Sequence, residues 1–158
     1  MKKIISAFLI AVLCFTFSSA AFEISDRELQ TMYMNQARDL ERASSYFAVR
    51  MVWASAGRDG ELELGFEVGC PRTMNRLGAI EIEVMRKSGD NWIPVKTYKY
   101  TDSGMGYIYG SDDATHTEAV YFQGTVGRDY FAYITLRAED DDGSDERVMI
   151  TNTVTAKD

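Results

Sequence analysis

An acidic turn near the C-terminal end carries the strongest candidate for metal chemistry. In the segment EDDDGSDE, six carboxylates fall within eight consecutive residues, and Gly143 permits a tight bend. Carboxylate oxygens are the hard ligands that calcium prefers, and Asp140, Asp142 and Asp145 are the candidates for a weak site. The helices and twelve-residue loop of an EF-hand are missing, and short acidic runs are usually solvated. We therefore prefer a solvated hairpin tip without a cofactor, with weak calcium binding as the alternative.

A tyrosine-rich stretch, YKYTDSGMGYIYG, is the second candidate site. On an extended chain, alternate side chains share a face, so the two YxY pairs are expected to meet across a hairpin. Packed together, such rings stabilise a sheet; exposed, they offer a platform for a sugar ring or a protein partner. The candidate ligand-binding residues are Trp92, Tyr98, Tyr100, Tyr107 and Tyr109.

The sequence assembles no recognisable catalytic centre. His116 is the sole histidine, and no Gly-x-Ser-x-Gly motif is present. Cys70 and His116 lie in separate predicted loops, and two such ligands are too few for a usual zinc site. We therefore expect no catalytic residues. A hydrolase that acts through two carboxylates remains the alternative.

Residues 1–20 have the pattern of a secretory signal peptide. Lys2 and Lys3 precede an apolar run over residues 4–17, and Ser18-Ser19-Ala20 offers small residues for cleavage. The run is short for a membrane helix, and no later segment approaches the roughly 20 apolar residues that a span requires. We expect a protein that is secreted or held at the cell surface, with no membrane span after removal of the signal.

Composition narrows the classes of partner. The chain has 17 basic and 24 acidic residues, and loss of Lys2 and Lys3 with the signal changes its net charge from −7 to −9. Such an acidic chain is repelled by phosphate backbones, so no nucleic-acid partner is expected. Cys70 would be the sole cysteine left, which excludes an internal disulfide and favours a small, buried side chain.

Two regions follow the signal. Residues 21–44 are predicted to be a short helix or a mobile linker, with Ser25 and Glu28 at capping-box spacing before a helix over residues 26–42. Residues 45–158 alternate with period two, as in ELELGFEV, and turn signals punctuate them, although GCPRTMNRLG is expected to be a loop. About seven strands are predicted, which indicates an all-β, immunoglobulin- or fibronectin-like antiparallel β-sandwich.

The predicted core follows from the same alternation. Tyr130 is expected to be buried, with its hydroxyl bonded near the preceding turn as in a tyrosine corner. The shared core is expected to contain Leu62, Leu64, Phe66, Ile80, Ile82, Val84, Ile134, Leu136, Val148 and Ile150.

The segments IEIEVMRKSGDNWIPVKTY and TVGRDYFAYITLRA, behind a signal peptide, resemble a family of small exported β-sandwich proteins from Gram-positive, often gut-dwelling, bacteria. The function of that family is unknown, and the shared motifs are structural. The resemblance covers about residues 45–155 and implies a fold and an extracellular location, without an active site.

These observations predict an exported, non-enzymatic binding module that contacts an extracellular protein or glycan at or beyond the cell surface. A secreted carboxylate-based hydrolase is one alternative. A structural subunit of a surface assembly, docking through residues 21–44, is the other.

Overall fold

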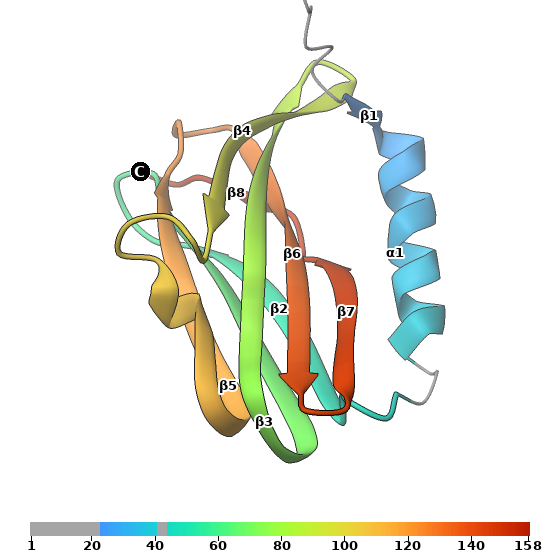
Figure 1. Cartoon of the computed structure of the whole chain (residues 1–158). Helices are drawn as coiled ribbons and strands as arrows, with labels where there is room; N and C mark the ends of the chain where they lie inside the picture. The colour runs from blue at the N-terminus through green and yellow to red at the C-terminus, as the bar shows by residue number, and fades with distance from the viewer. Residues whose placement is uncertain (1–22, 41–43) are drawn as a thin grey trace, which may run out of the picture.

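The computed structural model describes residues 23–40 and 44–158. The predicted signal peptide lies outside the described residues. Within them, eight strands form one antiparallel sheet, with a helix α1 (Asp26–Leu40) and a 3-10 turn η1 (Gly106–Ile108), which confirms the all-β class (Figure 1). The strands are β1 (Ile24–Ser25), β2 (Val49–Ala56), β3 (Glu61–Ser88), β4 (Asn91–Lys99), β5 (Tyr109–Gln123), β6 (Asp129–Asp140), β7 (Gly143–Ile150) and β8 (Val154–Thr155).

The long strand β3 organises the sheet. Its residues 61–69 pair with β2 on one side and with residues 115–123 of β5 on the other, and we call these three segments wing I. Further along β3, residues 76–86 pair with β6; on the other side, residues 76–78 pair with β5 and residues 81–88 pair with β4. We call residues 76–88 of β3, together with β4, β6 and β7, which pairs with β6, wing II. One continuous strand therefore belongs to both wings.

The segment GCPRTMNRLG is part of β3, so the prediction of a loop there is wrong. The pairing of β3 with β5 shifts register between Gly69 and Met74, and Pro71 lies inside this irregular stretch. A proline cannot donate to a ladder, but it is tolerated at a bulge, where a strand bends without ending. The polar, proline-containing segment therefore marks a bend in a strand.

The main core lies between the two wings. Wing I contributes Leu62, Leu64, Phe66, Val68 and Val120, and wing II contributes Ile82, Val84, Ala132, Ile134, Leu136 and Met149. Tyr130 joins them with 1% of its surface exposed, and its hydroxyl oxygen accepts the backbone N–H of Thr125 at 2.8 Å. The predicted tyrosine at the corner of the turn is confirmed.

Three of the predicted core residues, Ile80, Val148 and Ile150, lie outside the main core. Val148 is 61% exposed, because Met149 is the residue of β7 opposite the inward-facing Ile134. Val148 and Ile150 do share a face, but it is the outer one. Ile80 is only half-buried, since β3 shifts register against β6 at this residue and the alternation is interrupted there.

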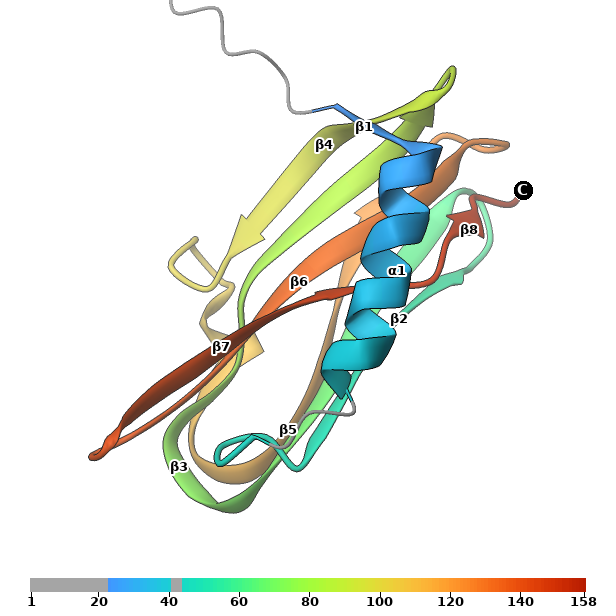
Figure 2. The same ribbon diagram turned by 90° about the vertical axis from the view of Figure 1, so that its right-hand side faces the viewer.

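The helix α1 packs against the outer face of wing II (Figure 2). It begins with the predicted capping box: the Glu28 carboxylate accepts the N–H of Ser25 at 2.8 Å, and the Ser25 hydroxyl oxygen accepts the N–H of Glu28 at 3.3 Å. Leu29 is buried in a second apolar cluster with Met85 and Phe131. The region from Asp26 to Leu40 is thus a docked helix rather than a linker, while residues 41–43 lie outside the described residues.

The far end of α1 is attached to β7 through a side-chain amide. Gln36 Nε2 donates to the carbonyl of Ile150 at 3.0 Å, and its Oε1 accepts the N–H of Ile150.

Within residues 23–40 and 44–158, no helix combines the length and the apolar character needed to cross a bilayer.

Candidate binding surface

The four predicted tyrosines do not meet across a hairpin. Strand β4 pairs with β1 and β3, whereas β5 pairs with β3, so β4 and β5 are not hydrogen-bonded neighbours. A turn and η1 separate them. Tyr100 and Tyr109 still come together, with ring centroids 5.1 Å apart in an edge-to-face arrangement. The guanidinium of Arg76 lies 4.9 Å from the first ring and 4.2 Å from the second.

This pair of rings is structural. Tyr109 is only 4% exposed, and its hydroxyl lies 3.4 Å from the Glu139 carboxylate, to which it donates. Burial, followed by the negative charge of Glu139, raises the pKa of Tyr109 to about 12. The ring therefore stays neutral and is inaccessible to a ligand.

The other two tyrosines stand at the margin of β5. The Tyr98 hydroxyl donates to the carbonyl of Tyr121 at 3.1 Å, and the Tyr107 hydroxyl donates to the carbonyl of Ala119 at 3.3 Å. Burial raises the pKa of both hydroxyls, so both remain donors. Tyr107 is 44% exposed and Tyr121 is 60% exposed. Tyr98, Tyr107 and Tyr121 thus hold aromatic rings where solvent reaches them.

Trp53, which sequence reasoning missed, lies on the outer face of wing I. It is opposite Gly65 in the register, and a Cβ atom added to that glycine would lie 2.3 Å from ring carbons Cε2 and Cζ2. The indole therefore lies over the glycine backbone, and its Nε1 donates to Glu63 Oε1 at 2.9 Å. The available signal was the glycine in ELELGFEV, where the alternation would otherwise place a polar side chain.

Trp92 is not part of this surface. It is 4% exposed, and its ring packs edge-on against Phe131 with centroids 4.9 Å apart. Its indole N–H donates to Asp26 Oδ1 at 2.8 Å, and Lys87 also bonds that carboxylate. These two donors lower the pKa of Asp26. Trp92 thus fixes the beginning of α1 on wing II.

The acidic turn is a network of ion pairs and backbone bonds. Asp140 Oδ1 accepts the N–H groups of Asp142 and Gly143 at 2.9 and 3.1 Å, and Oδ2 accepts two bonds from Arg72. The Arg72 guanidinium holds the pKa of Asp140 below its usual value. The tip follows the predicted tight bend, with Gly143 at φ 150°.

The predicted calcium ligands lie beside arginines: Asp140 and Asp142 beside Arg72, and Asp145 beside Arg147. Asp145 lies 2.7 Å from the Arg147 guanidinium and accepts a bond from the Ser44 hydroxyl at 3.0 Å. The Asp142 side chain is 87% exposed. In the part of the chain that the structure describes, no three His, Cys, Asp or Glu side chains are grouped to hold a metal ion.

Cys70 and His116 both have structural surroundings. Burial raises the pKa of the Cys70 thiol to about 11, so the thiol is protonated at neutral pH and is a weak nucleophile. His116 Nε2 lies 2.9 Å from the carbonyl of Tyr107, and its ring packs 5.8 Å from that of Phe66. The histidine therefore fastens η1 to wing I.

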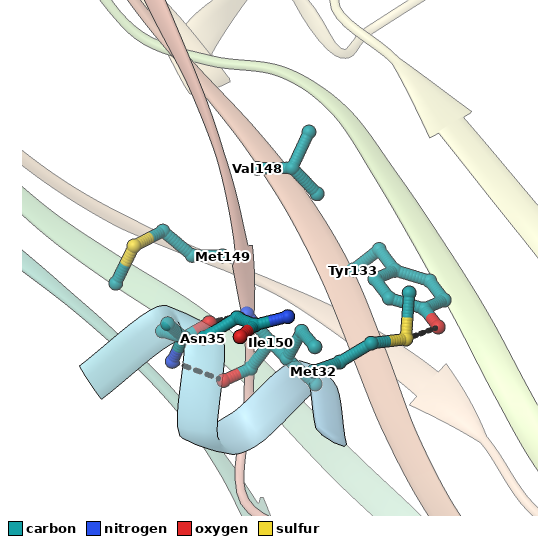
Figure 3. A pocket seen from close by; sticks show the side chains of 7 residues that line it. Met32, Asn35, Tyr133, Val148, Met149 and Ile150 are labelled. Carbon is teal, nitrogen blue, oxygen red and sulfur yellow. Dashed lines mark hydrogen bonds between the residues drawn. The ribbon is translucent and has the colours of Figure 1, made fainter. Parts of the chain in front are cut away.

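A cavity of about 260 Å³ lies where α1 meets β6 and β7 (Figure 3). Met32 and Tyr133 line one side, and the Tyr133 hydroxyl donates to the Met32 sulfur at 3.2 Å. Val148 and Ile150 line the β7 side. Its walls are mainly apolar and hold no charged side chain, so it is part of the packing of the helix on the sheet.

Comparison with known proteins identifies no family. No protein-family model and no curated protein matches the chain. One similar solved structure is the solution structure of a protein described as late embryogenesis abundant (LEA). It is 12% identical, with a TM-score of 0.39 over 83% of this chain and 80% of that one.

Proposed function

We propose that this chain is an exported, non-enzymatic binding module that acts at or beyond the cell surface. The observation that carries the proposal is an aromatic surface on and beside wing I, made by the exposed Tyr107 and Tyr121 and the half-buried Trp53 and Tyr98. Large exposed aromatic groups gathered on one face mark a site where a partner removes them from water.

The contrast between the two wings supports this assignment. The outer face of wing II carries Met85 and Phe131, and α1 buries both. The outer face of wing I carries Met51, 49% exposed, and Tyr121, 60% exposed, and no described helix packs there. The helix α1 thus covers the apolar outer face of wing II, whereas the outer face of wing I keeps aromatic rings at the surface. The outer face of wing I is therefore the one suited to contact a partner.

We further propose that wings I and II are the two layers of an immunoglobulin-like sandwich joined by β3. Their inward side chains share one core, as the layers of a sandwich do. The signal-peptide pattern of residues 1–20 supports export, and the resemblance to exported Gram-positive proteins agrees with it. Asp140 is bonded to Arg72, and His116 is bonded to the carbonyl of Tyr107. Because both side chains have structural partners, these contacts support a non-enzymatic role.

The proposal is tested with a pulldown from culture supernatant and cell-surface extracts. Protein beginning at Ala21 is immobilised, and retained proteins and glycans are identified. We expect Tyr107→Ala with Tyr121→Ala to lose the retained partner. Val126→Ala, at an apolar residue that is 48% exposed elsewhere on the surface, should keep it. Equal retention by all variants would exclude this surface as the binding site.

Export is tested separately, because it does not depend on the surface. The full chain is expressed with its own leader in a Gram-positive host, and the product is sought in the medium and on the wall. We expect an extracellular product whose mass corresponds to a chain beginning at Ala21. A full-length product confined to the cytoplasm would contradict the proposal.

A further inference from the structure

We propose that the outer face of wing I binds a neutral glycan, with one sugar ring stacked on Trp53 and its hydroxyls donating to Glu63. This inference rests on the binding function proposed above and specifies its ligand class. It is drawn from the register of three strands, the position of the indole and the charge of the surrounding side chains.

The indole forms a flat platform because small residues lie beneath and beside it. Gly65 is the register partner of Trp53 on one side and of Ala119 on the other. The ring covers the glycine, and the methyl group of Ala119 does not rise above the sheet to obstruct it. The bond from Nε1 to Glu63 fixes its orientation. A pyranose ring presents flat C–H surfaces that match such an aromatic face.

A second ring extends the platform. Tyr121 is directly opposite Glu63, and it is the diagonal neighbour of Gly65 across the β3–β5 pair. Diagonal neighbours in an antiparallel sheet are about 7–8 Å apart, within reach of aromatic side chains. Tyr121 is 60% exposed. Because the Trp53 ring lies over Gly65, Tyr121 is placed beside it on the same face and can contact a second unit of an oligosaccharide.

The charge of the face selects a neutral ligand that donates hydrogen bonds. The outward positions of wing I include Glu61, Glu63 and Glu67. No outward position of wing I is occupied by lysine or arginine. Ionised carboxylates are acceptors and repel anions, which disfavours sulfated or uronic-acid glycans. Sugar hydroxyls are complementary donors. A quaternary ammonium group is better held by a cage of several rings, whereas this platform is open and flat.

The test measures binding of defined oligosaccharides by intrinsic fluorescence and calorimetry. Protein beginning at Ala21 is titrated with cellopentaose and with the pentamer of N-acetylglucosamine; polygalacturonate and choline are the anionic and cationic comparisons. The chain has two tryptophans, and Trp92 is buried away from this face, so a fluorescence change that Trp53→Phe removes is assigned to Trp53. We expect at least one neutral oligosaccharide to bind and both comparisons to fail.

Three variants test the geometry. We expect Trp53→Ala to weaken binding at least tenfold. Gly65→Ala should do the same, because its methyl group would displace the indole. Glu63→Gln, a surface change that preserves one acceptor, should weaken it several-fold. Val126→Ala is the control and should bind as the wild type does. If Gly65→Ala does not fold by circular dichroism, Trp53→Ala and Glu63→Gln still test the proposal.

The outcomes separate this inference from the function on which it rests. If folded protein binds neither neutral oligosaccharide, or binds them equally well without Trp53, the glycan assignment is overturned. Retention of a protein partner in the pulldown would then leave the binding function standing. Binding of choline in place of glycans would also overturn the assignment, in favour of a cationic ligand. Failure of both experiments would remove the surface as a binding site altogether.

Discussion

The side-chain amide of Asn152 makes both hydrogen bonds that another strand would make with Ala54. Its Oδ1 accepts the N–H of Ala54, and its Nδ2 donates to the carbonyl, each at 2.9 Å. Gln36 does the same for Ile150 on β7. Strands β2 and β7 each have only one described strand neighbour, so these amides satisfy backbone groups at open edges.

Replacing Asn152 by alanine should destabilise the domain by about 1–3 kcal/mol, the usual cost of leaving a buried polar group unsatisfied. The reason is that Ala54 is buried and would lose both partners. Urea unfolding measures the change. Asn91→Ala is the control, because that amide donates to the exposed Glu23 carboxylate and not to a buried backbone group, and we expect a loss of less than about 0.5 kcal/mol. Equal losses would show that the amide does not support the edge.

The Tyr130 hydroxyl should contribute the net value of one hydrogen bond. Tyr130→Phe keeps the buried ring and removes the acceptor for the Thr125 N–H, so we expect a loss of about 0.5–1.5 kcal/mol. Leu64→Ala, in the same core, should cost more, about 2–5 kcal/mol, because it leaves a cavity. Tyr121→Phe, on the surface, is the matched control. No difference between the two Tyr→Phe variants would contradict the proposed role of the corner bond.

The ion pair between Arg72 and Asp140 should make stability fall in acid. The folded pKa of Asp140 is below its unfolded value of about 3.9, so the contribution is complete above that pH. It is lost as pH falls through the folded pKa. We expect Asp140→Asn to be less stable than wild type at pH 7, with the difference shrinking below about pH 4. Asp142→Asn, at a carboxylate that is 87% exposed, should show little effect at either pH.

Calcium should not stabilise the acidic turn, because Arg72 and Arg147 already neutralise Asp140 and Asp145. Thermal melts with about 1–10 mM calcium, above the dissociation constants of about 10⁻⁴–10⁻³ M typical of extracellular modules, should coincide with melts in chelator. A calcium-specific rise of several degrees, absent in Asp140→Asn with Asp142→Asn, would instead establish a site.

The Cys70 thiol should react slowly in the folded protein. With its pKa raised to about 11 by burial, only about one thiol in a thousand is ionised at pH 8. Alkylation by iodoacetamide, followed by mass spectrometry, should be slow in buffer and fast in urea. Rapid stoichiometric labelling of the folded chain would show that the thiol is exposed and activated.

The sequence was informative where one local signal specifies one conformation. The spacing of Ser25 and Glu28 predicted the start of α1. The position of Tyr130 after a glycine-containing turn predicted its buried hydroxyl. Each of these features depends on residues close in the chain, so the pattern is visible without the rest of the fold.

The remaining features depend on partners far away in the chain. Val84 and Met85 are both buried, as are Tyr130 and Phe131, because the core covers one face of these strands and α1 covers the other. Alternation alone cannot predict a second buried face. The platform of Trp53 is similarly hidden, because the glycine that receives the ring is twelve residues away.

Because β3 belongs to both wings, the domain has no seam along which its halves could part. A sandwich whose layers share only loops can lose one layer while the other persists. Here β3 pairs with β2, β4, β5 and β6, and β5 pairs with residues of β3 on both sides of the bend. Unfolding of either half of β3 therefore also removes hydrogen bonds that support the other half. The backbone itself thus couples the two wings into one cooperative unit, while Cys70, the cysteine among the described residues, stays a free thiol.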